Sequence, residues 1–283
     1  MTAREAYRHL KQSLAYLGQQ EAEAEAREAL CEICGIEVRE LLLNPGKAVC
    51  EEQSRALERL IARRSLGEPL AYVLGSRAFY GLRFSVTADV LIPRQETELL
   101  VERCICLVRR EKIESVLDLC TGSGCIAVCL ANHTDANVCA SDLSPAALKV
   151  ARENAENLGA QVRFLQSDLL QNVPGRFGLI VSNPPYLSDA EYASIPAAVR
   201  EREPALALRG GADGLYFYRR IAKQAPHSLL PGGYLALEIG FEQAEAVGGL
   251  LRAEGFGKIE VFADYAGLNR MVFAKLDRKL GAE

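Results

Sequence analysis

From Ser115 onward the chain alternates between segments patterned as β-strands and segments patterned as α-helices. The apolar run SVLDLC (115–120) precedes the helix-like GCIAVCLANH (124–133), and this alternation continues to NRMVFAKL (269–276). Strands joined by helical crossovers run parallel, with helices on both faces of their sheet. The pattern therefore predicts an α/β fold with a doubly wound, mostly parallel sheet. We expect an antiparallel strand at its C-terminal end.

Two differently patterned regions precede this sheet. Residues 1–75 carry apolar residues at helical spacing, interrupted at Gly18 and Gly35, which predicts a small helical bundle. Residues 76–92 combine aromatic and β-branched residues around Gly81, which predicts a β-hairpin linker. We therefore expect three parts: a helical domain (1–75), the hairpin (76–92) and an α/β domain (93–283).

Composition narrows the classes of function. A net charge of −4 argues against a protein that grips bare nucleic acid through long-range electrostatics. The nine cysteines and three histidines show no metal-ligand spacing beyond the lone Cys31/Cys34 pair, so we expect no metal. No apolar run reaches the roughly 18 residues that span a bilayer. We expect a cytoplasmic protein with reduced thiols and no membrane contact.

A glycine-rich turn follows the first strand of the α/β region. Gly122 and Gly124 let the backbone approach a ligand, and with Ala127 they fit the spacing of a dinucleotide fingerprint. Asp142 ends the next strand, where an acid accepts the hydroxyls of a ribose. These residues fit two cofactors, a nicotinamide dinucleotide and S-adenosylmethionine.

Further acids favour S-adenosylmethionine. Asp118 lies four positions before Gly122, where a carboxylate would repel a pyrophosphate but suits the ammonium and sulfonium of S-adenosylmethionine. Asp168 ends the third strand, at the position that borders the adenine in this layout. Asp168 can accept from the adenine amine while Leu169 covers a face of the ring.

The fourth strand ends in Asn183-Pro184-Pro185-Tyr186, an amide side chain beside a rigid corner. Strands one and four flank the crevice of a doubly wound sheet, so Asn183 should lie beside the reactive end of the cofactor. The Asn183 side-chain oxygen and the Pro184 carbonyl are two fixed acceptors for the two hydrogens of a planar NH2 group. Tyr186 offers a ring that can pack on the substrate. This corner predicts methylation of a planar nitrogen, in a nucleobase or an amide.

Several longer motifs favour an amide over a nucleobase as the substrate. The chain resembles class I methyltransferases, which have a Rossmann-like fold, and more closely the peptide chain release factor N5-glutamine methyltransferases (the PrmC/HemK family). The resemblance spans GEPLAYVLGSRAFYGLRFSV (67–86), VLIPRQETELLV (90–101), VLDLCTGSGCIAV (116–128), IVSNPPYL (180–187), EREPALALRGGADGL (201–215), GGYLALEIG (232–240) and DYAGLNRMVFA (264–274).

The resemblance implies transfer of a methyl group from S-adenosylmethionine to the glutamine of the Gly-Gly-Gln motif in class 1 release factors. S-adenosylhomocysteine would be the other product, and the helical domain would help to hold the release factor. We expect a monomer that binds no nucleic acid directly. The candidate residues are catalytic Asn183, Pro184 and Tyr186; cofactor-binding Cys120, Thr121, Gly122, Ser123, Gly124, Asp142, Asp168, Leu169 and Asn183; and substrate-binding Asn183, Pro184, Pro185, Tyr186, Arg94 and Glu98.

The sequence departs from the family pattern at three positions. The family commonly has Pro at Gln95, Gly at Cys120 and often an aromatic residue at Leu169. We expect small effects at Gln95 and Cys120, whose backbones stay available, and weaker packing on adenine at Leu169.

Three alternatives are weighed against this assignment. A DNA or RNA amino-methyltransferase acts on the same planar NH2 group, but it usually needs a basic groove. An NAD-linked oxidoreductase leaves Asn183 and its prolines without a role. A binding module that has lost catalysis has no use for an intact Asn183.

Overall fold

The computed structural model describes residues 1–277 of the 283-residue chain. The chain divides into two compact units, the first comprising Met1–Ser76 and the second beginning at Arg77. Each unit has a hydrophobic core of its own. No helix among the described residues is long and apolar enough to cross a membrane.

The first unit is a bundle of helices around a small apolar core that includes Leu10, Leu30 and Leu57. Thr2 opens the first helix with a reciprocal capping box to Glu5, which satisfies N–H groups that the helix itself leaves free. The helices expected from the pattern are confirmed, and α5 is an addition. The elements are α1 (Ala3–Ser13), η1 (Ala15–Leu17), α2 (Gln19–Cys34), α3 (Val38–Leu43), α4 (Glu51–Ser65) and α5 (Leu70–Leu74).

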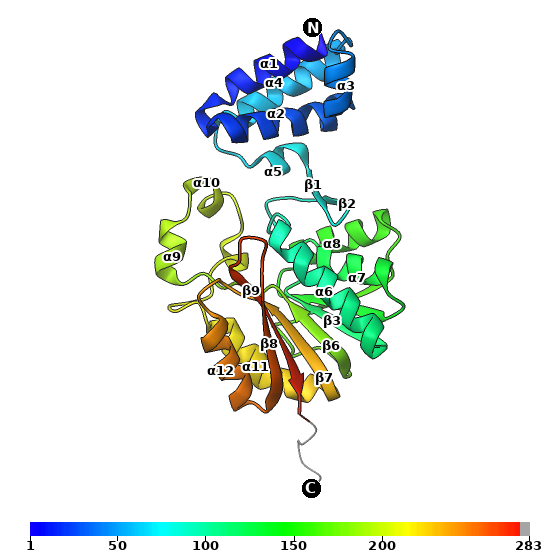
Figure 1. Ribbon diagram of the computed structural model, residues 1–283, viewed down its shortest axis with the longest axis vertical. Helices are drawn as coiled ribbons and strands as arrows, with labels where there is room; N and C mark the ends of the chain where they lie inside the picture. Colours follow the sequence, from blue (N-terminus) through cyan, green and yellow to red (C-terminus); the bar gives the residue numbers. More distant parts are fainter. Residues whose placement is uncertain (278–283) are drawn as a thin grey trace. The chain divides into compact units, whose positions relative to one another are not determined.

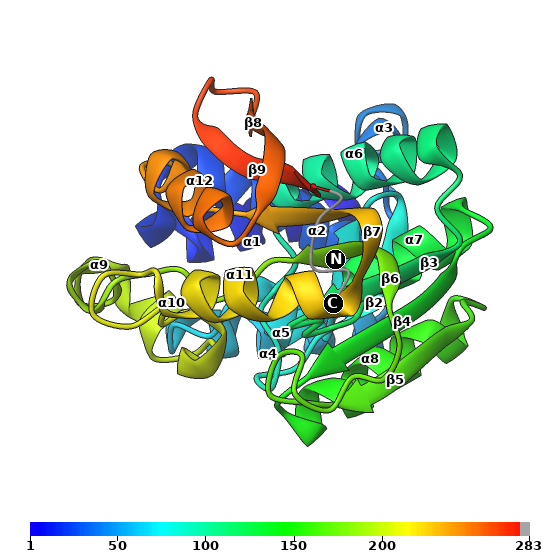
Figure 2. The same cartoon turned by 90° about the horizontal axis from the view of Figure 1, so that it is seen from below.

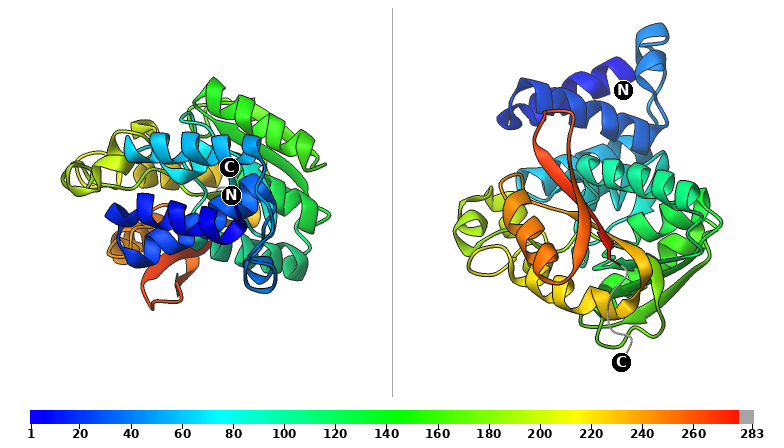
Figure 3. Two further views of the ribbon diagram at one scale, coloured as in Figure 1. Left: turned by 90° about the horizontal axis from the view of Figure 1, so that it is seen from above. Right: turned by 60° about the horizontal axis from the view of Figure 1, so that its bottom comes forward.

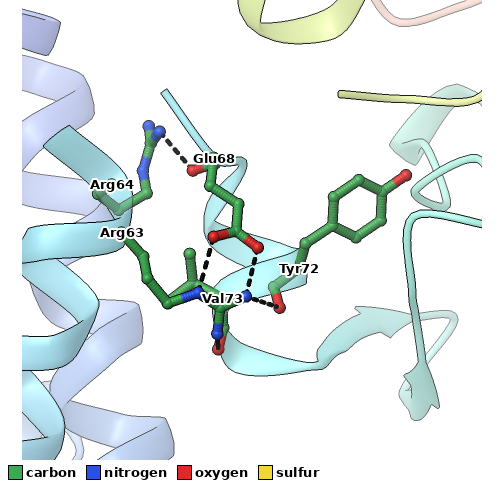
Figure 4. A network of polar contacts seen from close by, with 5 residues as sticks. All are labelled: Arg63, Arg64, Glu68, Tyr72 and Val73. Atoms are coloured by element: carbon green, nitrogen blue, oxygen red, sulfur yellow. Dashed lines mark hydrogen bonds and ion pairs between the residues drawn. The ribbon is translucent and has the colours of Figure 1, made fainter. Parts of the chain in front are cut away.

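Two adjacent arginines of α4 hold the loop that leads to α5. Arg63 binds the Glu68 carboxylate and the carbonyl oxygens of Tyr72 and Val73, while Arg64 donates to the Glu68 carbonyl at 2.8 Å (Figure 4). Arg64 also forms a bidentate pair with Glu25 of α2, at 2.7 and 2.8 Å. Arg64 is buried, so these bonds replace its lost hydration.

The expected hairpin is formed by β1 (Ser76–Phe79) and β2 (Leu82–Ser85), and all of it after Ser76 belongs to the second unit. Tyr80 and Gly81 both have positive φ, which is the geometry of a tight type I′ turn. Asn154 binds the backbone N–H and carbonyl of Ser85 at 2.7 and 3.0 Å. The hairpin is therefore held by side-chain bonds inside the second unit.

The centre of this unit is a seven-stranded sheet in the order β5-β4-β3-β6-β7-β9-β8. Neighbouring strands from β5 to β7 are parallel, and β9 is antiparallel to both of its neighbours. The predicted mostly parallel sheet with an antiparallel C-terminal strand is confirmed. The strands are β3 (Ser115–Leu119), β4 (Asn137–Asp142), β5 (Val162–Gln166), β6 (Phe177–Ser182), β7 (Leu229–Glu238), β8 (Phe256–Ala263) and β9 (Asn269–Leu276).

Helices cover both faces of the sheet. Strand residues alternate between two apolar clusters, so that Val116 packs with α6, α7 and α8 while Leu117 packs with α11 and α12. Figure 1 and Figure 2 show α11 and α12 together on the side away from α6 and α7, and Figure 3 shows the long β8–β9 hairpin. The helices are α6 (Gln95–Glu111), α7 (Cys125–His133), α8 (Pro145–Asn157), α11 (Tyr216–Ser228) and α12 (Ala244–Ala253).

The segment between β6 and α11 contains short elements that the sequence pattern does not reveal. These are α9 (Asp189–Ser194), α10 (Ala197–Arg200) and η2 (Ala205–Ala207). Leu187 and Arg209, at the two ends of this segment, form a parallel bridge. The excursion therefore returns to the place where it leaves the sheet.

The turn from β3 into α7 depends on close packing against α8. Gly124 caps α7 with φ +81, and a Cβ built on it would lie 3.0 Å from the Cβ of Ala151. Gly122 has φ +54, but a Cβ there would meet no atom within 4 Å. Both positions favour glycine by conformation, and only Gly124 favours it by contact.

These two glycines generate a matched test of the turn. We expect Gly122→Ala to lower the free energy of unfolding by about 1 kcal/mol, the cost of a side chain in the left-handed region. Gly124→Ala should cost about 3 kcal/mol, because overpacking against α8 adds to that cost. Urea unfolding measures both. Equal losses in the two variants would contradict the packing argument.

Candidate active site

A pocket lies at the carboxyl ends of β3, β4, β5 and β6. It contains about 1040 Å³ of space free of atoms, part of it open to solvent. The order of the sheet reverses between β3 and β6, where a doubly wound sheet places its crevice. Its walls include Cys120, Thr121, Gly122, Ser123, Asp142, Asp168, Leu169, Asn183, Pro185, Arg94 and Thr97.

Asp142 braces the glycine-rich turn from the end of β4. Its carboxylate accepts from the backbone N–H of Gly122 and of Ser144, both at 2.9 Å. Burial raises the pKa of Asp142, while these backbone donors act in the opposite direction. Each carboxylate oxygen keeps a further lone pair, so the group can still accept from a ligand in the pocket.

Asp118 is completely buried beneath the turn and is not part of the pocket wall. Its carboxylate accepts from the Thr121 hydroxyl at 2.5 Å. Burial raises the pKa of Asp118 to about 7. The carboxylate therefore acts on the turn through Thr121, whose side chain does line the pocket.

Asp168 and Leu169 follow β5 and line the same pocket. Asp168 pairs with Arg220 of α11 at 2.7 Å, with both side chains partly exposed. Leu169 is buried and has φ +52, a left-handed conformation that is unusual for a branched side chain. Cys120 has a similar φ of +57, which is why glycine suits its position.

Asn183 follows β6 directly and lines the pocket from the side facing α6. Its Nδ2 donates to the Thr97 hydroxyl at 3.2 Å, and that hydroxyl donates to a carboxylate oxygen of Glu238 at 2.6 Å. Thr97 and Glu238 are 3% and 2% exposed, so water does not compete for these bonds. The bond to Thr97 uses the NH2 half of the Asn183 amide, which leaves Oδ1 for a ligand.

The rest of the corner is held by backbone packing. Pro184 and Pro185 are buried, and Tyr186 is partly buried against the apolar cluster that contains residues of α11 and α12. Pro185 lines the pocket, whereas Pro184 and Tyr186 are not among its wall residues. A Cβ on Gly210 would lie 2.8 Å from the Tyr186 Cα and 2.9 Å from the Pro185 carbonyl oxygen. The strand exit and Gly210 therefore pack backbone against backbone.

The two substrate-binding candidates from the 90–101 motif, Arg94 and Glu98, lie in different places in the structure. Arg94 lines the pocket and pairs with the buried Glu203 at 2.5 Å, and Glu203 also accepts from the Ile92 N–H at 3.2 Å. The Glu98 carboxylate accepts from the Tyr80 N–H at 3.1 Å, at the hairpin turn. Glu98 is not part of the pocket wall.

Three buried residues of the site are not candidates from the sequence: Thr97, Glu203 and Glu238. Each lies in one of the long motifs, but none has a spacing that indicates a role. For Glu238 a signal exists, because it is an acid at the end of the otherwise apolar run YLAL. A buried strand rarely ends in a carboxylate without a reason.

Comparisons with known proteins identify families and structures to which the chain is similar. Residues 95–212 match the methyltransferase small domain family, and residues 5–75 match the PrmC N-terminal domain family. A solved methyltransferase from Pyrococcus furiosus has a TM-score of 0.52 at 18% identity, covering 79% of this chain and 99% of that chain. At this identity the likeness supports the fold alone.

Two curated relatives match nearly the whole length. The release factor glutamine methyltransferase of Cereibacter sphaeroides is 43% identical over 279 residues, covering 98% of this chain and 99% of the relative. The enzyme of the same name from Geobacter sulfurreducens is 42% identical over 265 residues, covering 93% of both chains. The chain belongs to the release factor glutamine methyltransferase family.

Proposed function

We propose that this protein transfers a methyl group from S-adenosylmethionine to the side-chain amide nitrogen of the glutamine in the Gly-Gly-Gln motif of class 1 peptide chain release factors. The observation that carries the proposal is the fixed Asn183 amide, whose NH2 group is bonded to Thr97 while its oxygen is left for the pocket. The full-length match to enzymes of that name supports the choice of substrate.

The substrate amide binds at the Asn-Pro-Pro-Tyr corner. Asn183 Oδ1 and the Pro184 carbonyl accept its two N–H groups, and Tyr186 and Pro185 bound the planar group. An amide nitrogen is a weak nucleophile because its lone pair is conjugated, and accepting both hydrogens raises its electron density. Fixed positions add more, since good alignment of reactants contributes about 7–11 kcal/mol. The two prolines supply that rigidity.

The residues of the pocket fit S-adenosylmethionine better than a dinucleotide. Its charged side chains are Asp89, Asp142, Asp168 and Arg94, a set that suits a cation. The Gly122 N–H, which would face a pyrophosphate in a dinucleotide site, already donates to Asp142. We assign the ribose hydroxyls to Asp142, the adenine to Asp168 and Leu169, and the remaining contacts to Cys120, Thr121, Gly122, Ser123, Gly124 and Asn183.

When bound, S-adenosylmethionine supplies an electrophilic methyl group on its sulfonium sulfur. The protein aims the amide lone pair at that methyl group through Asn183 and Pro184. No nucleophilic side chain is required, and burial raises the pKa of the Cys120 thiol, which keeps it neutral. Formation of the N–C bond would break the methyl–sulfur bond and leave S-adenosylhomocysteine, and the nitrogen would then lose its extra proton to water.

The other parts of the chain serve the protein substrate. The helical domain (1–75) helps to hold the release factor, the hairpin (76–92) joins it to the methyltransferase domain (93–283), and the protein acts as a cytoplasmic monomer without contacting nucleic acid. Arg94 contacts substrate at the pocket rim. Glu98 acts in the same region by fixing the hairpin turn, since its carboxylate is bonded to the Tyr80 N–H.

The identity of the substrate has a direct test. Incubation with labelled S-adenosylmethionine and either a recombinant class 1 release factor or nucleic acid should label only the release factor. Mass spectrometry should locate the new methyl group on the glutamine of the Gly-Gly-Gln peptide. Label that enters only nucleic acid would overturn the proposal.

Replacement of the central acceptor should stop transfer. We expect Asn183→Ala to lower kcat by at least about 100-fold, a loss typical of removing one fixed polar contact to the reacting group. Cofactor affinity should change much less. The matched control is Asn132→Ala, because Asn132 bonds the Leu158 carbonyl away from the pocket. Normal turnover in Asn183→Ala would rule out the two-acceptor arrangement.

Replacement of the ribose acid should act on binding first. Asp142→Ala removes the acceptor of the ribose hydroxyls and the brace of Gly122, so we expect affinity for S-adenosylmethionine to fall by about 10- to 100-fold. Isothermal calorimetry measures this change directly. Asp135→Ala, in the turn after α7, is the control. An unchanged dissociation constant in Asp142→Ala would contradict the ribose assignment.

A further inference from the structure

Asn183, Thr97 and Glu238 form one chain of hydrogen bonds with a definite direction. Nδ2 of Asn183 lies 3.2 Å from Thr97 Oγ1, and Oγ1 lies 2.6 Å from Glu238 Oε2. An amide nitrogen only donates, a charged carboxylate only accepts, and a hydroxyl has a single proton to give. The direction of these hydrogen bonds is therefore decided by which partner, Glu238 or Asn183, accepts the hydrogen bond from the Thr97 hydroxyl.

We propose that Thr97 and Glu238 are positioning residues, whose charged carboxylate fixes the Asn183 amide with Oδ1 toward the substrate. The charged Glu238 carboxylate accepts the hydrogen bond from the Thr97 hydroxyl. Thr97 Oγ1 can then only accept from Asn183, and Nδ2 is the atom of the Asn183 amide that can donate to it. Oδ1 is then directed to the pocket. The inference rests on the proposed function, in which Oδ1 accepts an N–H of the substrate amide.

A protonated Glu238 removes this selection. A neutral carboxyl group can donate to Thr97 Oγ1, and the Thr97 proton is then free to point to Asn183. The amide can rotate by half a turn to accept it with Oδ1, which leaves Nδ2 facing the pocket. A donor there faces the N–H groups of the substrate and repels them.

Burial makes this protonation accessible near neutral pH. It raises the pKa of Glu238 to about 7, against the effects of Thr97, Arg270 and the Asn183 side chain, which all lower it. The transfer rate should therefore rise with pH, reaching half of its maximum near pH 7, as the carboxylate becomes charged. The charged or titratable groups that face Glu238 are Glu96 on α6, Cys125 on α7, Tyr186 after β6, Tyr218 on α11 and Arg270 on β9.

Three of these neighbours do not titrate near pH 7. Burial raises the pKa of Cys125 to about 12 and raises the pKa of both tyrosines, so all three stay neutral. Arg270 is held by Asp264 at 2.9 Å. The other buried acid with a pKa of about 7 is Asp118, which lies under the glycine turn and bonds Thr121. A variant at Glu238 separates the two acids.

The position of Glu238 is costly for stability alone. Its side chain forms no ion pair with any lysine or arginine among residues 1–277, so no direct cation partner offsets the cost of burying its charge. Its folded pKa lies above its usual value of 4.5, so the folded state loses stability as pH rises from there through about 7. A residue retained at this cost is expected to serve the site.

Three variants test the proposal. Thr97→Val removes the hydroxyl without changing the shape and should lower kcat by about 10- to 100-fold. Thr97→Ser restores the hydroxyl and should restore kcat. Glu238→Gln cannot become charged, so kcat should fall by a similar factor and its rise with pH around neutrality should disappear. Cofactor affinity should stay near that of the unmodified protein in all three.

The readouts are methylation of a recombinant class 1 release factor across about pH 5.5–9, calorimetry with S-adenosylmethionine, and thermal unfolding. Thr134→Val is the matched control, because that hydroxyl caps α7 by bonding the Leu130 carbonyl. Above pH 7 Glu238→Gln should unfold at an equal or higher temperature than the unmodified protein. A merely structural role would lower that temperature instead.

The outcomes separate this inference from the proposed function. If the unmodified protein methylates no release factor, the proposed function fails. If it does, but Thr97→Val or Glu238→Gln keeps full kcat, the positioning role is wrong. If Glu238→Gln loses activity yet keeps the rise with pH, the titrating group is another acid, Asp118, and the role of charge at Glu238 is wrong.

Discussion

The site depends on the pairing of β3 with β6. Leu119 is in register with Ser182, and the Ser182 hydroxyl donates to the Leu119 carbonyl at 2.8 Å. The residues that follow these two partners are Cys120, which starts the glycine turn, and Asn183. Segments more than 60 positions apart in the chain thus enter the pocket side by side. Neither half of the site has a defined geometry without the other.

Polar groups with little exposure to solvent then orient the residues that the sheet brings to the pocket. Asp118, Asp142, Glu203 and Glu238 are acids whose bonds go to backbone N–H groups, hydroxyls or one arginine. In a medium of low polarity each unsatisfied group would be expensive, so each bond also selects one arrangement of its partner.

The sequence predicts the fold well because its signals are local. Ser144 and Pro145 mark the start of α8, and the Tyr80-Gly81 turn marks the hairpin, each through the geometry of a few neighbouring residues. The prediction that the first and fourth strands of this region, β3 and β6, are neighbours also followed from the general topology of doubly wound sheets. The short elements α9, α10 and η2 stayed hidden, because helices of one turn have no periodicity to detect.

The sequence predicted best those pocket residues that follow the end of a recognisable strand. Asp142 and Asn183 lie where the pattern placed them, at the pocket. Asp118 lies in the layer below, and Glu98 reaches the hairpin, because the direction of a side chain depends on packing that a single sequence does not encode. Thr97 and Glu238 are 141 positions apart in the chain, and no local sequence pattern predicts the hydrogen bond between them.

The closed ends of the excursion from Ser188 to Leu208 have a consequence for how such proteins diversify. Leu187 pairs with Arg209, and Gly210 packs on the Pro185–Tyr186 backbone, so both ends of the excursion are fixed beside the site. Its second half is held again at Glu203, which pairs with Arg94. Doubling the length of such a loop costs only about 0.6 kcal/mol of closure entropy. Insertions and deletions around α9 and α10 are therefore expected to leave the Asn183–Tyr186 corner in place.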